Sequence, residues 1–403
     1  SIKAAFVEDD EVPSWFIKGL TGVRYNSMLS GKAAINAMEG NILGLALKPM
    51  TSTLGAAYQL DGGQLSKALA TYGGISENFK RAARHMVEEW KFAVSNPEEA
   101  MMKGRADLIQ KQMDNMDIMD QMADIWKQEG QHGKAMMWNL SKSLHGFNNS
   151  RFTRYGLNAM YALDGFTNSM IMSANARAKA YDELIPNRAA YASNEAFREA
   201  FIAKSDEVYS QFFDANGALK QELPGSVKYQ AGELEFNLDD AAATKISDIT
   251  NKLPLAKALF SFPRTGINAL KYTWSFNPVG GVIANSAGVG KMGAVFTAQT
   301  DEQIAAALKM HGIEELDKEA FKALKSEYIG RQMVGSTVVT LAGLWAMEGN
   351  LRGNGPNNAR DRKAMQAMGW KARTIRNPIN GEWMSYENRE PFTSILSTVG
   401  DIV

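Results

Sequence analysis

The sequence contains no cysteine, and this absence excludes several kinds of chemistry at once. Disulfide bonds, thiolate nucleophiles and metal centres with cysteine ligands cannot form in this chain. Histidine is scarce too, because His85, His132, His145 and His311 are scattered and no pair has the spacing of a metal-binding motif. We therefore expect neither a metal nor another cofactor.

Recognisable catalytic motifs are also missing. No Gly-x-Ser-x-Gly nucleophile elbow occurs, and paired acids such as Glu88 and Glu89 lie on polar helix surfaces. Lytic transglycosylases usually carry a catalytic Glu followed by Ser, and the sequence has no Glu-Ser dipeptide. Gly288, Gly290 and Gly293 have the spacing of a dinucleotide-binding loop, but no convincing strand precedes them. We predict that the chain is not an enzyme, although a longer chain could carry a lytic domain elsewhere.

Charge of one sign does not dominate, because 44 Lys and Arg residues balance 44 Asp and Glu residues. A chain with zero formal net charge has no overall field that would attract nucleic acid or anionic lipid. Any such contact must therefore come from a local patch.

Long hydrophobic runs are absent as well. The most apolar uncharged segment is 332–347, whereas a helix needs about 20 apolar residues to span a bilayer. Two interpretations are open: a helix buried in the protein, or a helix that is buried now and enters a membrane later. The side chains that would contact a membrane or another subunit are Val338, Leu341, Leu344 and Trp345.

Helical periodicity runs along most of the chain. We predict an N-cap at Ser76, a helix end at Pro186, and a short strand pair or irregular loop at 226–240. The predicted helices are 28–48, 64–72, 76–95, 96–130, 151–184, 194–213 and 239–251.

The predicted fold is mainly α, with an elongated multi-helix body and a small C-terminal β-hairpin. Three regions are expected along the sequence. They are an N-terminal helical region (1–150), a central helical region (151–330), and an apolar helix followed by a basic linker and a β-hairpin module (331–403).

Methionine is abundant, with 22 residues, and some of these residues form a helical stripe. Met113, Met116, Met119 and Met122 recur every three residues. Residues with this spacing share one helix face, which is far more often a packed surface than a cofactor site. We expect this face to contact another helix or another subunit.

The segment NPINGEWMSYENREPF (377–392) departs from the helical pattern. Asn380-Gly381 separates two runs with period-two alternation and predicts a tight hairpin turn with positive φ at both residues. Trp383 and Tyr386 differ in parity, so one should face inward and the other should face solvent or a partner. A lone hairpin is only marginally stable, so we expect it to dock on the preceding helices or on another chain.

Basic residues cluster between the apolar segment and the hairpin. From 331 to 376, eight basic residues accompany two acidic ones, which gives a net charge of +6. Such a cluster suits a phosphate backbone, anionic lipid head groups or an acidic neighbouring subunit, and it is also compatible with a solvated surface. Besides Arg331, the candidate contact residues are Arg352, Arg360, Arg362, Lys363, Lys371, Arg373 and Arg376.

Several stretches share a pattern with a known family. The C-terminal part has a glycine-rich break, a Gly-Trp step, a basic strand, the sequence EWMSY, and a Glu-Pro-Phe step before a small apolar helix. The segment FSFPRTGINALKYTWSFNPVG (260–280) follows F-P-F-x-R-T-P-x-N-I-x-K-Y, with Gly266 where proline is usual. Together these motifs resemble the internal virion or DNA-ejection (inner core) proteins of short-tailed bacteriophages, of the large polyvalent protein type. The residues that carry the resemblance are Arg264, Asn268, Tyr272, Trp370, Trp383, Tyr386 and Pro391.

The resemblance implies a phage structural protein of the internal core. Such proteins lie in the virion interior, often as a ring on the portal, and are ejected to form a DNA-translocation conduit across the cell envelope. The implied partners are further copies of the chain, other core or portal proteins, double-stranded DNA bound through its backbone, and the host inner membrane. After ejection the implied location is the host periplasm and inner membrane.

Two alternatives from other classes remain open at this point. One is a membrane-inserting pore-forming protein, in which the segment 332–347 enters the bilayer directly. The other is a peptidoglycan hydrolase with an unrecognised catalytic Glu.

Overall fold

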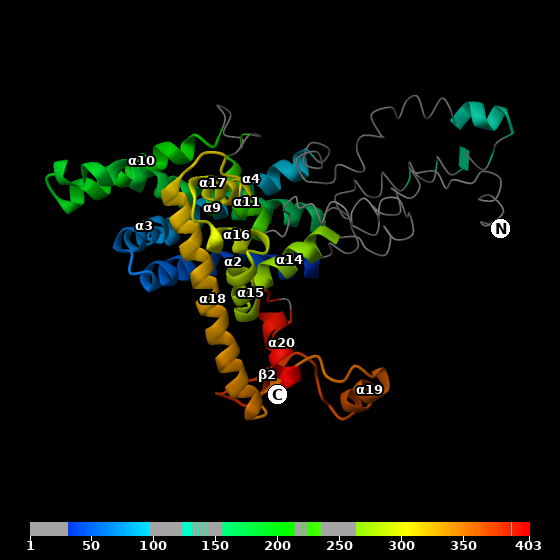
Figure 1. The fold of residues 1–403 in the computed structure, drawn as a ribbon. Coiled ribbons are helices and arrows are strands. Elements are labelled where there is room, and N and C mark those ends of the chain that lie inside the picture. Colours follow the sequence, from blue (N-terminus) through cyan, green and yellow to red (C-terminus); the bar gives the residue numbers. More distant parts are fainter. Residues whose placement is uncertain are drawn as a thin grey trace. The chain divides into compact units, whose positions relative to one another are not determined.

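The computed structural model describes residues 31–96, 123–130, 155–213, 224–234, 263–387 and 389–403, together with positions 132, 135, 136, 139, 143 and 220. Helices account for most of this part of the chain, and the strands lie near the C-terminus (Figure 1). The prediction of a mainly α fold with a small C-terminal β element is confirmed. The methionine stripe at 113–122 and the helix predicted at 239–251 lie outside the described residues.

Most predicted helices are present, with shifted ends. Up to residue 234 they are α2 (Gly31–Tyr58), α3 (Gly62–Tyr72), α4 (Ile75–Ser95), α9 (Tyr155–Leu184), the 3₁₀ helix η2 (Ile185–Ala190), α10 (Asn194–Ser210) and α11 (Gly225–Leu234). From residue 263 they are α14 (Pro263–Phe276), α15 (Pro278–Ala287), α16 (Gly290–Thr297), α17 (Asp301–Lys309), α18 (Lys318–Met347), α19 (Ala359–Ala367) and α20 (Phe392–Ile402). The strands are β1 (Leu351–Arg352), β2 (Thr374–Arg376) and β3 (Trp383–Ser385).

Local chemistry explains where several helices begin and end. The Asp61 carboxylate accepts a hydrogen bond from the Gln64 amide at the start of α3, with an Oδ1–N distance of 3.0 Å. Asp317 accepts one from the Ala320 amide at the start of α18, at 2.9 Å, so both acids satisfy amides that lack a partner within the helix. Pro186 ends α9 as predicted, because its ring removes a backbone donor, and the chain continues as η2.

The predicted N-cap at Ser76 is wrong by two residues. The Asn78 amide donates to the Gly74 carbonyl, at 3.0 Å, and α4 begins at Ile75. Ser76 therefore lies in the first turn of α4, and Gly74 is the residue before the helix. Glycine is also common at this position.

The strand pair or loop predicted at 226–240 is also wrong where the chain is described. Residues Gly225–Leu234 form α11, and its apolar residues Val227, Ala231 and Leu234 are all buried. These three positions recur at intervals of four and three residues, so they occupy one helix face toward the core.

The chain forms two compact units, each assembled from separate segments of the sequence. The first consists of Ser1–Met38, Arg81–Phe166 and Asp240–Pro263, and the second consists of Glu39–Lys80, Thr167–Asp239 and Arg264–Val403. In the first unit the rings of Phe92 on α4 and Tyr161 on α9 stack with their centroids 6.3 Å apart. The candidate site described below lies entirely in the second unit.

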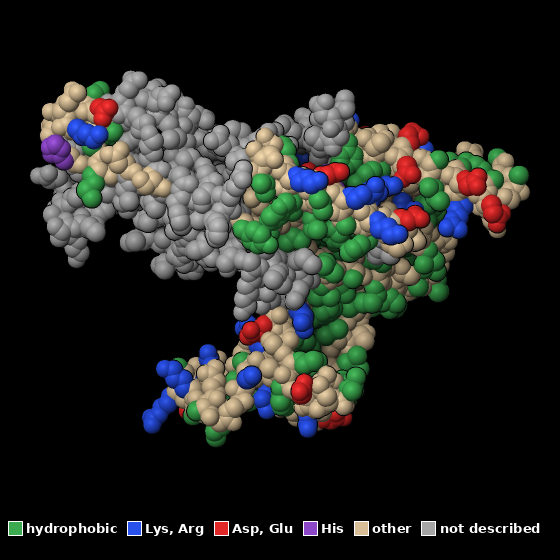
Figure 2. Space-filling model, turned by 180° about the vertical axis from the view of Figure 1, so that it is seen from behind, with side chains coloured by type: hydrophobic (Ala, Val, Ile, Leu, Met, Phe, Trp, Pro, Cys, Tyr) green, Lys and Arg blue, Asp and Glu red, His purple; other side chains and the backbone are tan. Residues whose placement is uncertain are grey.

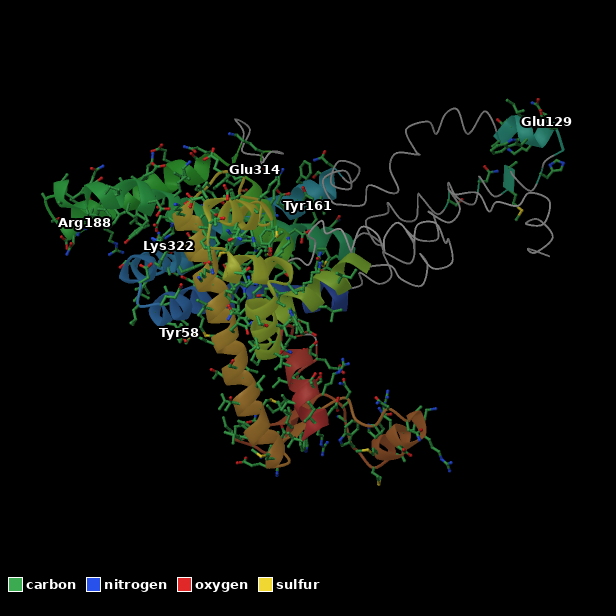
Figure 3. The ribbon with its side chains drawn as sticks, viewed as in Figure 1. Tyr58, Glu129, Tyr161, Arg188, Glu314 and Lys322 are labelled. Atoms are coloured by element: carbon green, nitrogen blue, oxygen red, sulfur yellow. The ribbon has the colours of Figure 1, made fainter. Side chains whose placement is uncertain are left out.

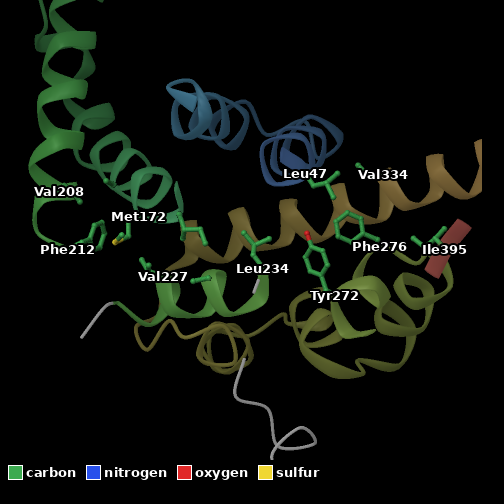
Figure 4. Packing of buried hydrophobic residues seen from close by; sticks show 13 residues of the cluster. Leu47, Met172, Val208, Phe212, Val227, Leu234, Tyr272, Phe276, Val334 and Ile395 are labelled. Carbon is green, nitrogen blue, oxygen red and sulfur yellow. The ribbon is translucent and has the colours of Figure 1, made fainter. Parts of the chain in front are cut away.

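A shared apolar core holds the second unit together (Figure 4). Leu47 of α2, Met172 of α9, Leu234 of α11, Phe276 of α14 and Val334 of α18 are all buried in it. Burying one such side chain stabilises a fold by roughly 1.5–3 kcal/mol. A second apolar cluster joins α15, α16, α17 and α18, so α18 contributes to both.

Helices α2 and α18 cross at a contact between their backbones. A Cβ atom added to Gly55 would lie 1.7 Å from the Ser326 carbonyl oxygen, and one added to Gly330 would lie 1.8 Å from the Thr51 carbonyl oxygen. No side chain fits at either position, so the two glycines allow this close crossing.

The predicted hairpin is confirmed, and it gains a third strand that the sequence did not indicate. The strands are antiparallel in the order β1-β2-β3. Tyr386 is only 3% exposed and packs with Leu351 and Ala342 of α18, while Trp383 is half-buried on the other face. The opposite orientation of these two aromatic residues and the docking of the hairpin on a preceding helix are therefore as predicted.

The predicted tight turn at Asn380-Gly381 is wrong. Only Gly381 has a positive φ, and the loop runs over 377–382, because Arg376 is the last paired residue before it and Trp383 the first after it. Asn377 organises this loop: its side-chain oxygen accepts from the Ile379 amide, and its carbonyl accepts from the Gly381 amide. Asparagine before proline favours such a side-chain turn, which replaces the two-residue turn here.

Candidate nucleic-acid interface in the C-terminal module

Helix α19 carries the most exposed part of the predicted basic cluster. Asn358 caps this helix by accepting a hydrogen bond from the Arg360 amide, with an Oδ1–N distance of 2.9 Å. No residue of α19 is buried, so the whole helix is accessible to solvent. It belongs to the C-terminal module, which we define as residues 351–387 and 389–403.

The seven predicted contact residues from 352 to 376 all lie in this module. Four of them are exposed, namely Arg360, Lys363, Lys371 and Arg376. The half-buried ones bind neutral groups: Arg362 donates from Nε to the Pro356 carbonyl at 3.0 Å, and Arg373 donates to the Asn354 side chain at 2.8 Å. Arg352 lies against the ring of Trp383.

None of these seven cations forms an ion pair with a carboxylate among the residues that the structure describes. The nearby Asp401 carboxylate is occupied by neutral donors, the Asn354 side chain and the Gly355 amide. Figure 2 shows blue side chains gathered on the α19 end of the module, at the lower left. The module contains eight Lys and Arg residues and five Asp and Glu residues, so its net charge is +3. Because its exposed cations have no carboxylate partner among the described residues, they can bind an anionic partner.

Arg331 does not belong to this surface, which corrects the sequence-based cluster. It is 3% exposed, and its guanidinium donates to both carboxylate oxygens of Glu233, at 2.9 and 2.6 Å. It also donates to Glu327 at 2.6 Å, and the Lys48 ammonium binds the same Glu327 oxygen at 3.2 Å. The result is a buried cluster of two cations and two anions at the crossing of α2, α11 and α18.

The sequence carries only a weak signal of this cluster. Glu233 lies between the buried residues Ala231 and Leu234, and a charge within an apolar helical stretch usually has a buried partner. Its partner is 98 residues further along the chain, and nothing in the sequence connects the two positions.

Electrostatics keep both acids of the cluster ionised. Burial by itself raises the pKa of Glu327, but Lys48 and Arg331 outweigh this effect and lower the pKa to about 2. The pKa of Glu233 is lowered as well, because attraction to Arg331 outweighs the effect of burial. An acid in this state at neutral pH cannot donate a proton, so neither residue suits the role of a general acid.

A cavity of about 860 Å³ opens beside this cluster. Lys48, Glu233, Glu327 and Arg331 are part of its lining, together with residues of α3, α9 and α10. Within this lining, Glu233 and Glu327 are tied to cations, so neither of these two acids suits the role of proton donor in a glycosidase-type reaction.

A second buried group of polar residues lies nearby, and both ring nitrogens of its His311 form hydrogen bonds. The His311 ring nitrogen Nδ1 lies 2.7 Å from the Ala307 carbonyl oxygen and therefore donates to it. The other nitrogen, Nε2, lies 2.9 Å from the Tyr328 hydroxyl and accepts its proton. Burial lowers the pKa of His311 to about 4, so the ring is neutral at neutral pH.

The predicted apolar helix 332–347 is not a separate element but the second half of α18. Val338 packs against the core, whereas Leu341 and Leu344 are 56% and 52% exposed. Trp345 is partly buried, and its indole N–H has no hydrogen-bond partner among the described residues. In the described part of the chain, no helix combines the length and the apolar character that crossing a membrane requires.

The residues that carried the family resemblance mostly serve packing. Asn268 and Tyr272 of α14 are buried, Pro391 is buried at the start of α20, and the Trp370 indole lies against Gly355. Arg264 starts α14, and its side chain lies outside the described residues. Buried members of the set therefore contribute to packing in the second unit, whereas Trp370 and Trp383 are partly exposed in the basic module.

The glycine motif at 288–293 is a turn between two helices. Gly288 ends α15 with a φ of 63°, and Gly290 begins α16 with a φ of 72°. Since a helix and not a strand precedes the motif, it lacks the context of a dinucleotide-binding loop.

No protein-family model matches this chain, and neither a curated protein nor a solved structure does.

Proposed function

We propose that the chain is a structural protein of the phage internal core that binds the backbone of double-stranded DNA through its C-terminal module. The observation that supports this most directly is a group of exposed cations that have no carboxylate partner in the described part of the chain, namely Arg360, Lys363, Lys371 and Arg376. Binding to phosphates would release counterions, and no base-specific contact is needed.

The wider role follows from the sequence resemblance to internal virion proteins. Copies of the chain assemble in the virion interior with other core or portal proteins, and are ejected to form part of a conduit across the host envelope. The balanced net charge fits such a role, because DNA contact is then confined to one module. Electron microscopy of the purified protein tests the assembly directly: rings support the proposal, and a persistent monomer contradicts it.

DNA binding is tested with a fluorescently labelled duplex of random sequence. The affinity should fall steeply with salt, with a slope of about −3 to −4 in a plot of log K against log salt if roughly four phosphates are neutralised. Replacing Arg360, Lys363 and Lys371 by Glu should flatten this slope and weaken binding. A slope near zero for the unaltered protein would contradict the proposal.

A matched control is available elsewhere in the second unit. Lys309, Lys318 and Lys322 are also exposed, but each lies within 4 Å of an acid, Glu314, Asp301 and Glu319 respectively. Figure 3 shows Lys322 near the start of α18, at the opposite end of that helix from α19. Reversing these three lysines changes the net charge equally and should leave duplex binding close to that of the unaltered protein.

A further inference from the structure

The outer face of the small sheet has an unusual composition. Antiparallel pairing places Arg352 opposite Thr374 and Arg376 opposite Trp383, and residues two apart on a strand share a face. All four therefore lie on one face, whereas Leu351 belongs to the face packed toward α18. Besides Thr374 and Ser385, this face carries the Trp383 indole and two arginines.

The Arg352 side chain crosses the middle strand to reach the indole. Arg352 is on β1 and Trp383 is on β3, yet the guanidinium carbon lies 3.6 Å from the Trp383 ring centroid. Thr374 lies between them on β2 and is only 2% exposed, as expected if the arginine covers it. A separation of 3.6 Å is that of stacked planar groups, so the indole supports the guanidinium in a fixed position.

Both arginines keep donors available for a ligand. Arg376 uses Nε to bind the Gly381 carbonyl, at 3.3 Å, and no bond of its terminal amino groups is found among the described residues. Arg352 stacks on Trp383 and has no carboxylate partner in the described part of the chain. The face thus presents one supported planar cation and one exposed cation.

We propose that this face, which we name the Arg–Trp platform (Arg352, Trp383 and Arg376), binds single-stranded nucleic acid. An unpaired base stacks on the outer side of the Arg352 guanidinium, which the indole backs, and Arg376 contacts the adjacent phosphate. This inference rests on the proposed function, because both place a nucleic acid on the same module. It adds a preference for unpaired bases, which phosphate contacts alone do not give.

Stacking explains why single strands are favoured. In a duplex the bases are already stacked on each other, so their faces cannot reach the platform unless the duplex opens. Every base has a flat face, so the preference for single strands does not require a particular sequence. DNA and RNA share this chemistry, and the experiment has to separate them.

The test compares the affinities of the full chain for a labelled oligothymidylate, an oligouridylate and a duplex of equal length, all at one salt concentration. We expect both single strands to bind more tightly than the duplex. Replacing Trp383 by Leu should lower the ratio of single-strand to duplex affinity by about 5- to 100-fold, the range found for loss of one stacked base. The Trp383→Phe variant should retain most of the ratio because it keeps an aromatic ring.

A second variant guards against a simple loss of folding. Arg352→Lys keeps the positive charge but removes the planar guanidinium group. It should therefore lower the ratio of single-strand to duplex affinity about 5-fold or more, with an unchanged melting temperature. If the unaltered protein binds single strands no better than duplex, or if Trp383→Leu and Arg352→Lys leave the ratio unchanged, the platform is overturned while duplex binding stands. If neither duplex nor single strand binds, the proposed function fails with it.

Discussion

Arg331 of α18 and Glu233 of α11 form a two-point ion pair inside the second unit. Nη1 donates to Oε1 at 2.9 Å and Nη2 donates to Oε2 at 2.6 Å, and both residues are less than a tenth exposed. The planar guanidinium and carboxylate match each other in this arrangement, which fixes the rotation of one helix relative to the other.

Breaking this pair should be costly. Arg331→Met removes the cation and leaves Glu233 buried without its main partner, so the free energy of unfolding should fall by about 3–5 kcal/mol. Urea unfolding followed by circular dichroism measures the change. Arg198→Met, at an exposed position of α10, serves as the control and should change stability by less than about 0.5 kcal/mol. Equal effects of the two substitutions would show that the pair is not structurally important.

Stability should decline in mild acid because of His311. Its pKa is about 4 in the folded protein, against 6.5 for the free side chain, so the unfolded state binds the proton first. Stability is therefore fully present above about pH 6.5 and falls by up to about 3 kcal/mol as the pH drops to about 4. Urea midpoints measured across this range should show the decline in the unaltered protein and a weaker decline in His311→Gln. Parallel curves for the two proteins would rule out this residue as the cause.

Two glycines of α18 should respond in opposite ways to the same substitution. Gly330→Ala places a Cβ 1.8 Å from the Thr51 carbonyl oxygen and should cost at least about 2 kcal/mol, because α2 must move. Gly343→Ala meets no neighbouring atom of the described residues within 4 Å and should stabilise the helix by roughly 0.5–1 kcal/mol. Thermal unfolding of both variants checks the contrast, and a loss of similar size in both would contradict the close crossing.

The hydroxyl of Tyr386 should contribute measurably to docking of the hairpin. It donates to the Arg352 carbonyl at 2.7 Å, and burial raises its pKa to about 12, so it stays protonated. Tyr386→Phe keeps the ring but leaves this carbonyl without that donor, and should cost about 1 kcal/mol. Tyr58→Phe, at a position that is 68% exposed, is the matched control and should be neutral in a denaturant titration.

Reversing the charge of α19 should impair genome delivery if the proposed function holds. Phage carrying Glu in place of Arg360, Arg362 and Lys363 should assemble poorly or eject DNA inefficiently, because the phosphate contacts become repulsive. Plaque counts and the release of genomic DNA from purified particles measure this. Normal infectivity would remove these residues from the proposed DNA contact.

Much of the secondary structure could be predicted because its causes are local. The helix end at Pro186 and the starts of α3 and α10 depend on side chains within a few residues of each boundary. Alternation on either side of the hairpin loop likewise predicted β2 and β3. The predicted turn type was wrong because the side chain of Asn377 organises the loop in place of a tight turn at Asn380-Gly381.

The sequence predicts that basic residues form the candidate site, but it does not predict which of them belong to the site. The sequence identified eight basic residues between 331 and 376, and seven of them lie in the C-terminal module without acidic partners among the described residues. It could not separate Arg331 from the others, because only the crossing of α11 and α18 decides that this residue meets Glu233.

By itself the sequence determined the helical class of this protein, the position of its hairpin and the location of its positive charge. These follow from periodicity, turn residues and composition, which act over a few residues. Tertiary structure alone decided which charges are buried in pairs and which stay available, and it placed Arg352 across β2 onto Trp383. The reason is physical: desolvation and pairing depend on neighbours that the chain brings together only when it folds.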